Sequence, residues 1–510
     1  MTRFLISILV SATMLMFNLN INASDDVTED PAPSGTVLTE VQKAQLNDID
    51  IPILNFNLAE GAFPDFECIS HPEGCVGASI INNKWVEGEL KITRKGEVLY
   101  ESGPYVAKES GIRLKARGNG SSNEGGIKSK RPSYKIKLSK KANILIGDES
   151  VSKSKDWVLL KDRYVDLKNI AGFETARLLG LGWQPRGYMV VLMINGNYFG
   201  NYFLIEAISA DKDRIDITDS GFIIEDDAYW WKQPDESFKT EYIQYAMGWT
   251  FKDPDFEDLS EDTRKNIEKV TRLAENVICN GPDSESRTLG DVIDIESFAT
   301  WVLAQDIINN RDGNGSNIFL IKDDLDMTNP FNSKFRMNAL WDMDGAFNTT
   351  PDAFSSVHAS NMFWYPKLFE YPEFCRAYKE KWDSVKYTIF YDVMKVLNER
   401  LKLMPGLDAS RRWAGSMITT KDCMQAMEDY FQHRLPVLDN LIENIAMESG
   451  VNDVVIPVDI PSSIPSDGGV EWIMTNNARV FGLDGVLRSS FAKGVNIIRF
   501  SDGQTIKLVF

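Results

Sequence analysis

The hydrophobic pattern of this chain changes about halfway along its length, and that change limits the folds open to it. Between residues 51 and 206, apolar and polar residues mostly alternate, as they do in β-strands that bury one face. From about residue 262 onward, apolar residues recur at helical spacing, which indicates amphipathic helices. Strands followed by helices, rather than alternating with them, predict an α+β fold.

Several elements are marked clearly enough to be placed. Two hairpins are expected, one in VEGELKITRKGEVLYES at 86–102 around a Lys-Gly turn and one in YMVVLMINGNYFGNYFLIE at 188–206 around Asn-Gly. A strand is expected at IPILNFNL near residue 51, and an amphipathic helix at LKNIAGFETARLLG between the hairpins. The second half is expected to hold a helix that ends at Ile308 and a long helical tail from Cys375.

The two ends of the chain differ from the middle. Residues 1–23 combine one Arg, a short apolar run and a small final residue, which predicts a cleaved secretory signal peptide. Residues 24–48 are polar and acidic and predict a flexible linker, and residues 447–470, rich in Pro, Ser and Gly, predict another. Residues 471–510 alternate in the short segments VEWIMT, RVFGL, VNIIRF and QTIKLVF, which predict a small β module.

The composition limits the partners of the chain. A formal net charge of -19 argues against sequence-independent nucleic-acid binding, which depends on Lys and Arg. After the N-terminal apolar run, no segment is long and apolar enough to predict a membrane span. Five cysteines fit an oxidising compartment, with Cys68 and Cys75 close enough in sequence to bridge. We therefore expect an exported protein in the periplasm, on the cell surface or in the medium.

The local charge reverses between residues 113 and 141. This stretch holds ten Lys and Arg residues against one acid, in a chain that is otherwise acidic. It includes RGNGSSNEGG, which starts at Arg117 and can bring backbone N–H groups close to an anion. In the strand YKIKL that follows, Lys135 and Lys137 share one face. Kinases hold nucleotide phosphates with such a turn and strand, although solvated strand faces beside a surface loop give the same charge run.

Two acidic motifs follow in the second half. NRDGNGSN places Asn317 five residues after Asp312, the spacing of the kinase pattern H-R-D-x-x-x-x-N. In that pattern the Asp accepts the proton of the substrate hydroxyl and the Asn binds Mg²⁺. WDMDG then places Asp342 and Asp344 after an apolar strand, where carboxylates suit Mg²⁺. Spacing does not decide which of these two acids is the principal ligand, and Asp and Asn are also ordinary turn residues.

Taken in order, these segments resemble the CotH (spore coat protein H) kinase family. The RGN loop, YKIKL, DWVLLKDRYVDLKNIAGFETARLLGLG, INGNYFGNYFLIE, the D-x-x-x-x-N loop and WDMDG carry the resemblance. It implies an atypical, secreted protein-kinase-like fold with a β-rich N-lobe and a helical C-lobe. Such a protein binds ATP with Mg²⁺ or Mn²⁺ and phosphorylates a secreted or cell-surface protein. The kinase-like domain is expected at 106–446, after a β-rich module at 49–105.

The resemblance also assigns roles to residues. Asp312 resembles the family's catalytic Asp, Asn317 and Asp342 its metal ligands, and Asp344 occupies a supporting position beside them. Of the two strand lysines we favour Lys137 as the phosphate contact, with Glu174 on the amphipathic helix as a candidate partner. The full expected nucleotide-binding set is Arg117, Gly118, Asn119, Lys135, Lys137 and Glu206.

The chain departs from the family pattern at two places. RGNGSSNEGGIKSK is longer and richer in glycine than the usual RGN loop, and LKN stands where many members carry an Arg before the Asn. The main rival hypothesis is a non-catalytic adhesion or scaffold protein of the cell surface that keeps the fold. Residues 471–510 resemble the C-terminal sorting domains of type IX secretion, which implies a role in export.

Overall fold

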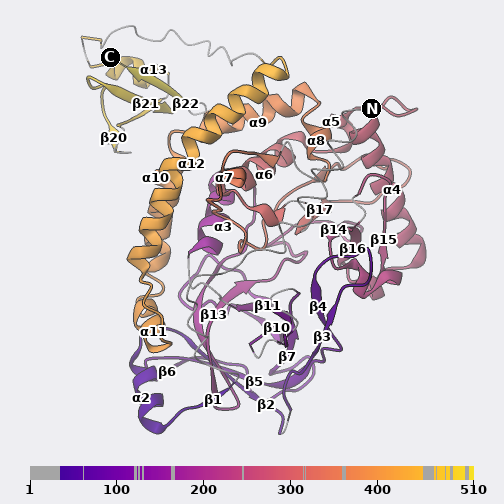
Figure 1. The fold of residues 1–510 in the computed structure, drawn as a ribbon, viewed down its shortest axis with the longest axis vertical. Helices are drawn as coiled ribbons and strands as arrows, with labels where there is room; N and C mark the ends of the chain where they lie inside the picture. The colour runs from indigo at the N-terminus through magenta and orange to yellow at the C-terminus, as the bar shows by residue number, and fades with distance from the viewer. Residues whose placement is uncertain are drawn as a thin grey trace.

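The computed structural model has an α+β architecture, as the sequence predicts (Figure 1). The expected signal peptide at 1–23, residues 24–34 of the expected linker and residues 452–464 of the second linker lie outside the described residues. The structure describes residues 35–60, 62–119, 123–124, 127–128, 131–161, 167–243, 246–313, 315, 317–358, 363–451, 465–466, 468–476, 478–482, 486–499 and 505–509.

The first half of the chain forms a closed sheet. Its members pair antiparallel with their neighbours, except that β12 and β2 are parallel, and β12 also pairs with β13 to close the ring. In ring order the strands are β13 (Asn197–Glu206), β11 (Ser154–Lys161), β10 (Ser133–Ala142), β7 (Ile112–Arg117), β5 (Val86–Arg94), β2 (Ile53–Leu58) and β12 (Gly187–Ile194). The edge strands β1 (Thr36–Val37) and β6 (Glu97–Glu101) extend it.

The two expected hairpins are confirmed, and each turn has left-handed backbone. Lys95 and Gly96 join β5 to β6 with φ values of 50° and 76°. Asn195 and Gly196 join β12 to β13 with φ values of 51° and 78°. Turns of this kind match the twist of antiparallel strands, which is why Lys-Gly and Asn-Gly mark hairpins in a sequence.

The structure differs from the expected organisation near the N-terminus. β5 pairs with β7, so the sheet continues across the boundary expected at residue 105 instead of forming a separate module. Residues 35–48, expected to belong to a flexible linker, form β1 and helix α2 (Glu40–Asp48). Thr39 and Gln42 make a capping box at the start of α2, and Leu46 is buried. A short polar helix held by its cap and one apolar contact carries little hydrophobic periodicity, so the pattern missed it.

The second half of the chain holds a five-stranded sheet as well as the helices that were expected to dominate it. The apolar segment IFLIK, which follows the Asp312 motif, forms strand β17, and no local pattern marks its partner strands. The antiparallel sheet has the order β15 (Ser237–Phe238), β16 (Gly248–Asp253), β14 (Phe222–Asp227), β17 (Ile318–Lys322) and β18 (Phe335–Arg336). Short hairpins elsewhere join β3 (Glu67–Ser70) to β4 (Ala78–Ile81) and β8 (Asn123–Glu124) to β9 (Ile127–Lys128).

Helices surround this second sheet, and Figure 1 shows α4, α6, α8 and α9 at the end of the molecule opposite β2 and β5. The expected helical tail is divided, because α9 ends at Val385 and α10 begins at Ile389. The helices are α3 (Lys168–Leu178), α4 (Glu261–Asn280), α5 (Leu289–Val292), α6 (Ile295–Ile308), α7 (Pro351–Phe354), α8 (Tyr365–Leu368), α9 (Pro372–Val385), α10 (Ile389–Leu401), α11 (Leu407–Trp413) and α12 (Thr420–Glu448).

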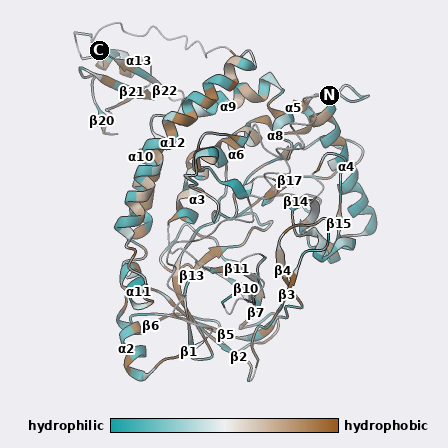
Figure 2. Ribbon diagram, viewed as in Figure 1, coloured by the Kyte–Doolittle hydropathy of each residue, from teal (hydrophilic) through white to brown (hydrophobic). Residues whose placement is uncertain are grey.

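Burial differs between α6 and α12. Every residue of α6 from Phe298 to Ile308 is buried, so this helix lies in the core. The longer α12 buries one side only, and Figure 2 shows both hydrophilic and hydrophobic colours along it. None of the helices in the described parts of the chain has the length and apolar character that crossing a membrane requires.

A small sheet forms near the C-terminus, with the order β20 (Leu487–Arg488), β19 (Arg479–Phe481), β21 (Val495–Arg499) and β22 (Thr505–Val509). The strands expected in RVFGL, VNIIRF and QTIKLVF are therefore present. The strand expected at VEWIMT is wrong, because this segment is helix α13 (Val470–Thr475). Six residues are too few for periodicity to separate the two states, and here Trp472 packs on Phe491 with ring centroids 5.6 Å apart.

Candidate active site

The loop that carries Asp312 begins where the buried helix α6 ends. Asn309, with φ of 47°, turns the chain out of the helix. The buried side chain of Asn310 then links the two acidic motifs: its Nδ2 donates to the carbonyl oxygen of Asp342 at 3.1 Å, and its Oδ1 accepts the N–H of Asp312 at 3.3 Å. The sequence analysis did not single out Asn310, although it opens the NRDGNGSN motif.

The carboxylate of Asp312 rests against Gly345 of WDMDG. A Cβ built on Gly345 would lie 2.8–3.1 Å from the carboxylate atoms, so a glycine is needed for this approach. Asp312 is reached by solvent, but the surrounding protein partly desolvates its carboxylate. This desolvation and the negative charge of Asp342 raise the pKa of Asp312 to about 7, although a hydrogen bond from the N–H of Gly345 lowers it. The two motifs thus bring their acidic residues within electrostatic reach of each other.

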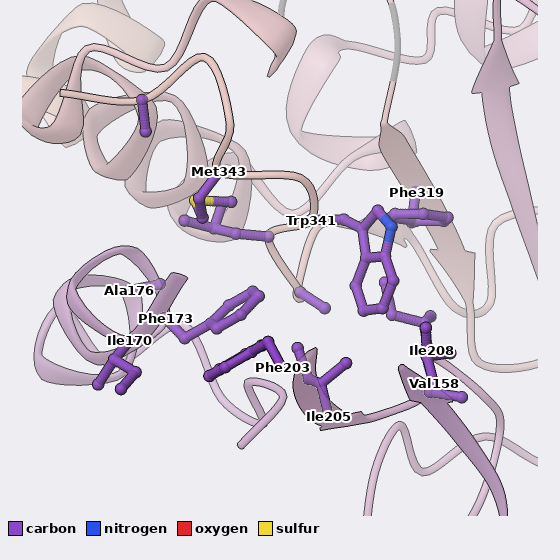
Figure 3. Packing of buried hydrophobic residues seen from close by; sticks show 14 of the residues in the cluster. Val158, Ile170, Phe173, Ala176, Phe203, Ile205, Ile208, Phe319, Trp341 and Met343 are labelled. Atoms are coloured by element: carbon purple, nitrogen blue, oxygen red, sulfur yellow. The ribbon is translucent and has the colours of Figure 1, made fainter. Parts of the chain in front are cut away.

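Side chains alternate along WDMDG between the core and the site. Trp341 and Met343 are buried, whereas Asp342 is half-buried and Asp344 is exposed. Figure 3 shows Trp341 beside Phe319 of β17 and Met343 directed toward Phe173 and Ala176 of α3. This alternation turns both carboxylates away from the core, and the charge of Asp342 acts on Asp312.

The donor set around Asp342 fits a divalent cation. Desolvation raises the pKa of Asp342, while the N–H of Asp344 and the charge of Arg117 lower it. Asn317 donates through Nδ2 to the carbonyl oxygen of Asp312 at 3.3 Å, which leaves its amide oxygen unused by this bond. Two carboxylates that repel each other beside an amide oxygen are oxygen ligands of the kind Mg²⁺ takes, with phosphate oxygens completing the shell.

No group of three or more His, Cys, Asp or Glu residues in the described ranges is arranged to hold a metal by itself. Mg²⁺ at phosphate-transfer sites is usually bound by one or two carboxylates and by substrate phosphates. Asp342 and Asn317 are the ligands this arrangement offers most directly, with Asp344 exposed beside them.

The RGN loop lies beside WDMDG, at the end of β7. The guanidinium of Arg117 is 6.0 Å from the ring centroid of Trp341. Burial lowers the pKa of Arg117, and the nearby charge of Asp342 opposes that shift. The side-chain oxygen of Asn119 accepts hydrogen bonds from Ser79 Oγ at 2.7 Å and from Lys232 Nζ at 3.2 Å. Residues 120–122, 125–126 and 129–130 of the expected glycine-rich loop lie outside the described residues.

The strand lysines lie on one face of β10, as predicted, while Tyr134, Ile136 and Leu138 are buried on the other. Lys137 Nζ is 4.0 Å from Asp156 Oδ1. Burial lowers the pKa of Lys135, and the charges of Asp156 and Asp255 oppose that shift. The choice between the two lysines as a phosphate contact stays a prediction.

Two expected acids are engaged by arginines within the protein. Glu174 forms ion pairs with Arg177 and Arg400, so the described contacts pair it with neither strand lysine. Glu206, at the end of β13, is buried, pairs with Arg214 at 3.4 Å and accepts the N–H of Arg186 at 3.1 Å. Desolvation raises the pKa of Glu206 and the charge of Arg214 lowers it.

Strand β14 brings further charged residues to the site that the sequence analysis missed. Glu225 and Asp227 share one face of the strand, and Glu225 accepts a hydrogen bond from Lys252 at 2.7 Å. The charge of Glu225 acts on both Arg117 and Asp342. Desolvation, followed by the charge of Glu225, raises the pKa of Asp227 to about 6, while Lys232 lowers it. The signal in the sequence was the run of three acids that ends the apolar segment FIIEDD.

Comparisons with known proteins place the site within a matched region. Residues 114–399, more than half of the chain, match the family model described as "CotH: CotH kinase protein". Among solved structures the chain is similar to "Shewanella oneidensis MR-1 Toxin Antitoxin System HipA, HipB and its operator DNA complex", with 10% identity and a TM-score of 0.26. That match covers 59% of this chain and 62% of the other, and a TM-score this low supports no conclusion. No curated protein matches the chain.

Proposed function

This chain belongs to the CotH kinase protein family, and on that premise we propose that it is an exported kinase that transfers the γ-phosphate of ATP to a hydroxyl of a secreted or cell-surface protein. The closed sheet serves as the N-lobe of an atypical kinase-like fold, and the helices with the second sheet serve as its C-lobe. Export is inferred from the leader-like residues 1–23 and from the resemblance of residues 471–510 to sorting domains.

The observation that carries the proposal is the meeting of three segments that are distant in the sequence. Arg117 comes from the end of β7, Asp312 from the loop after α6, and Asp342 from WDMDG. The charge of Arg117 acts on Asp342, and the charge of Asp342 acts on Asp312. A triphosphate with its metal requires a cationic side chain next to paired carboxylates. If the two acidic motifs were only turns, they would not need to lie close to Arg117.

In the proposed reaction, each residue has a distinct task. Asp312 orients the acceptor hydroxyl and takes its proton, and a pKa of about 7 suits a group that accepts a proton near neutral pH. Asn317 and Asp342, with Asp344 beside them, are the residues that would hold Mg²⁺ or Mn²⁺, which would supply positive charge to the phosphates of the nucleotide. Positioning and electrostatic stabilisation are most of what phosphoryl transfer asks of a protein.

The nucleotide itself is held by the basic side of the site. Arg117 and one of Lys135 and Lys137 neutralise phosphate charge, and the backbone at Gly118 and Asn119 approaches the phosphates. Glu206 contributes through its ion pair with Arg214, which fixes the end of β13.

The test uses purified protein, γ-labelled ATP, Mg²⁺ or Mn²⁺ and a panel of extracellular proteins. We expect Asp312→Asn to lower phosphate transfer by about a hundredfold or more while ATP binding persists, because general-base catalysis contributes that much. Asp342→Asn should weaken binding of ATP in the presence of the metal. Asp219→Asn, an exposed acid outside the site, is the matched control and should leave both unchanged.

The outcomes separate the enzyme from its rival. A wild-type protein that binds ATP with metal but labels neither itself nor any added protein supports the non-catalytic scaffold hypothesis. A protein that does not bind ATP at all rules out the proposed kinase. If Asp342→Asn binds ATP and metal as well as the wild type does, the metal assignment is wrong.

A further inference from the structure

Arg311 precedes Asp312 in the sequence, yet its side chain has different neighbours. Its Nη2 donates to the carbonyl oxygen of Ala353 and to Ser356 Oγ, both at 2.5 Å. Both acceptors belong to the segment that follows WDMDG, where α7 ends and two serines follow. The carboxylate of Asp312 instead lies against Gly345. The two adjacent side chains therefore contact different segments: Arg311 contacts Ala353 and Ser356, and Asp312 contacts Gly345.

The surroundings of Arg311 carry an unused hydrogen-bond donor. Its Nε is buried and has no hydrogen-bond partner among the residues that the structure describes. A buried N–H without an acceptor loses its hydration without replacement, and the cost is larger when the group is charged. Because Nε and one Nη of a guanidinium form a fork that matches two oxygens of a phosphate, this unused donor next to a serine hydroxyl suits a phosphate ester.

The region also carries excess positive charge. Arg434 is fully buried and donates to the carbonyl oxygens of Phe354 and Ser356, which brings a second guanidinium to the same segment. Desolvation lowers the pKa of Arg311, the charge of Asp306 opposes this, and Arg434 lowers it further. The carboxylate of Asp306 already accepts hydrogen bonds from His358 and from the hydroxyl of Tyr378. With Asp306 offsetting one of the two guanidiniums, one positive charge remains for an added phosphate to pair with.

We propose that Ser356 is a phosphorylation site, and that its phosphate is held by Nε and Nη2 of Arg311. The proposal rests on the proposed kinase function, which supplies the phosphoryl donor. Ser355, one residue earlier, is exposed, and its Oγ donates to the carbonyl oxygens of Pro351 and Asp352. Ser355 therefore offers a matched serine that has a similar sequence context but is hydrogen-bonded to the main chain instead of to Arg311.

The proposed transfer takes place between two copies of the chain, because Ser356 Oγ is held by Arg311 whereas the Asp312 carboxylate lies against Gly345. In the reaction, Ser356 Oγ forms a bond to the γ-phosphorus of ATP, and the bond from that phosphorus to the β,γ-bridging oxygen breaks. ADP is the leaving group. The hydroxyl proton passes to the Asp312 carboxylate of the acting copy. Ser356 is half-buried, so its hydrogen bonds to the carbonyl oxygens of Asp352 and Ala353 open first.

A phosphate at Ser356 would regulate the site through Arg311. Its two bonds to the guanidinium tie the segment after WDMDG to the loop that carries Asp312. Phosphorylation orders kinase segments in this way, by creating new pairs between arginine and phosphate.

The experiment compares four proteins incubated with γ-labelled ATP and Mg²⁺: wild type, Ser356→Ala, Ser355→Ala and Ser356→Thr. We expect phosphoserine in the wild type and in Ser355→Ala, and loss of that label in Ser356→Ala. Ser356→Thr keeps a hydroxyl at the same place, so its label should appear as phosphothreonine. Asp312→Asn should be labelled only when wild-type protein is added, and Asp312→Asn with Ser356→Ala should not be labelled at all.

The outcomes distinguish this inference from the proposed function. Wild-type protein that phosphorylates another protein but carries no phosphate at Ser356 overturns the inference and leaves the kinase intact. Labelling whose rate per molecule does not fall on dilution overturns the transfer between copies. Arg311→Lys keeps the charge but loses the fork, so a phosphatase should release its phosphate faster than that of the wild type; equal rates overturn the role of Arg311.

Discussion

At the scale of single residues, the candidate site depends on unusual backbone. Asn317 and Asp342 have φ values of 55° and 57°, in the left-handed region that residues with a side chain rarely adopt. The cost is smaller for Asn and Asp than for other residues with a Cβ, and strained residues cluster at functional sites. The motif spacing in the sequence predicted which residues to examine, because H-R-D-x-x-x-x-N is a local pattern. Their strain and their partners, such as Asn310 and Gly345, depend on contacts that spacing does not encode.

The glycine beneath Asp312 allows a sharp test. Gly345→Ala would place a Cβ 2.8–3.1 Å from the carboxylate, so Asp312 must shift. Gly345 is a described glycine whose φ is not positive, so its backbone conformation is open to alanine. We expect phosphate transfer to fall by about a hundredfold, as when a positioned base is lost, with little change in melting temperature. Gly290→Ala, where the nearest atom is 3.6 Å from the added Cβ, is the control. Undiminished transfer in Gly345→Ala would remove Asp312 from its proposed role.

At the scale of secondary-structure elements, local signals predicted well and non-local pairings did not. The turns at Lys95-Gly96 and Asn195-Gly196 fix their hairpins from within a few residues, and both hairpins form. Strand β14 is paired on one side with β16 and on the other with β17, far along the chain. No local pattern marks such a pairing, so the sequence did not predict that Glu225 and Asp227 lie at the site.

A short segment after β14 joins the two halves beside the RGN loop. Trp231 Nε1 donates to the carbonyl oxygen of Val76 at 3.2 Å, and Lys232 donates to Asn119. We expect Lys232→Met to weaken binding of ATP with Mg²⁺ about tenfold, since a hydrogen bond involving a charged group contributes about 1.5 kcal/mol. Adenosine, which lacks phosphates, should bind as before. Lys239→Met is the control, because Lys239 lies over the Trp230 ring at 4.1 Å. Isothermal titration calorimetry measures the binding of both ligands to the wild type, Lys232→Met and Lys239→Met. Equal losses of ATP and adenosine binding in Lys232→Met would indicate a merely structural role for Lys232.

Helix α10 is attached to the closed sheet by a buried ion pair. Arg400 pairs with Asp148 and also donates to the carbonyl oxygen of Gly187 at 3.1 Å. Both charged side chains are nearly inaccessible to solvent. Replacing Asp148 leaves the buried Arg400 with only the longer contact to Glu174 at 4.0 Å as a charged partner. Asp148→Asn should therefore lower the free energy of unfolding at pH 7 by about 3 kcal/mol.

The pH dependence of this pair has a definite sign. Desolvation raises the pKa of Asp148, but hydrogen bonds from Arg400 and Ser150 outweigh it, and the net pKa is lowered. The stabilisation is therefore complete above the ordinary carboxyl pKa of about 4 and is lost as pH falls through the lowered value. Urea unfolding at pH 7 and pH 3 should show a smaller difference between wild type and Asp148→Asn at pH 3. A difference that stays constant would contradict the sign. Glu261→Gln, in an exposed pair with Lys265, should change little at either pH.

At the scale of the whole molecule, the two halves share one hydrophobic core, which includes Ile136 of the closed sheet and Trp301 of α6. The sequence pattern predicted strands first and helices second, and the α+β class followed from it. It did not predict that the sheet closes, because closure depends on the parallel pairing of β2 with β12 across more than a hundred residues. Nor did it predict that the expected N-terminal module is part of that sheet.

The C-terminal sheet stands apart from this core, which gives the last prediction. Val480, Phe491 and Ile498 form a hydrophobic cluster of their own. Contacts to the rest of the chain include β22 against α9 and an ion pair of Arg499 with Asp392 at 3.8 Å, in which both side chains remain partly exposed. Exposed pairs contribute little. A chain that ends at residue 451 should therefore keep ATP binding, and its main calorimetric transition should stay within about 2 °C of the full-length value. Arg499→Ala in the full-length chain is the control for the interface. A truncated chain that loses the main transition would mean that the small sheet supports the kinase-like part.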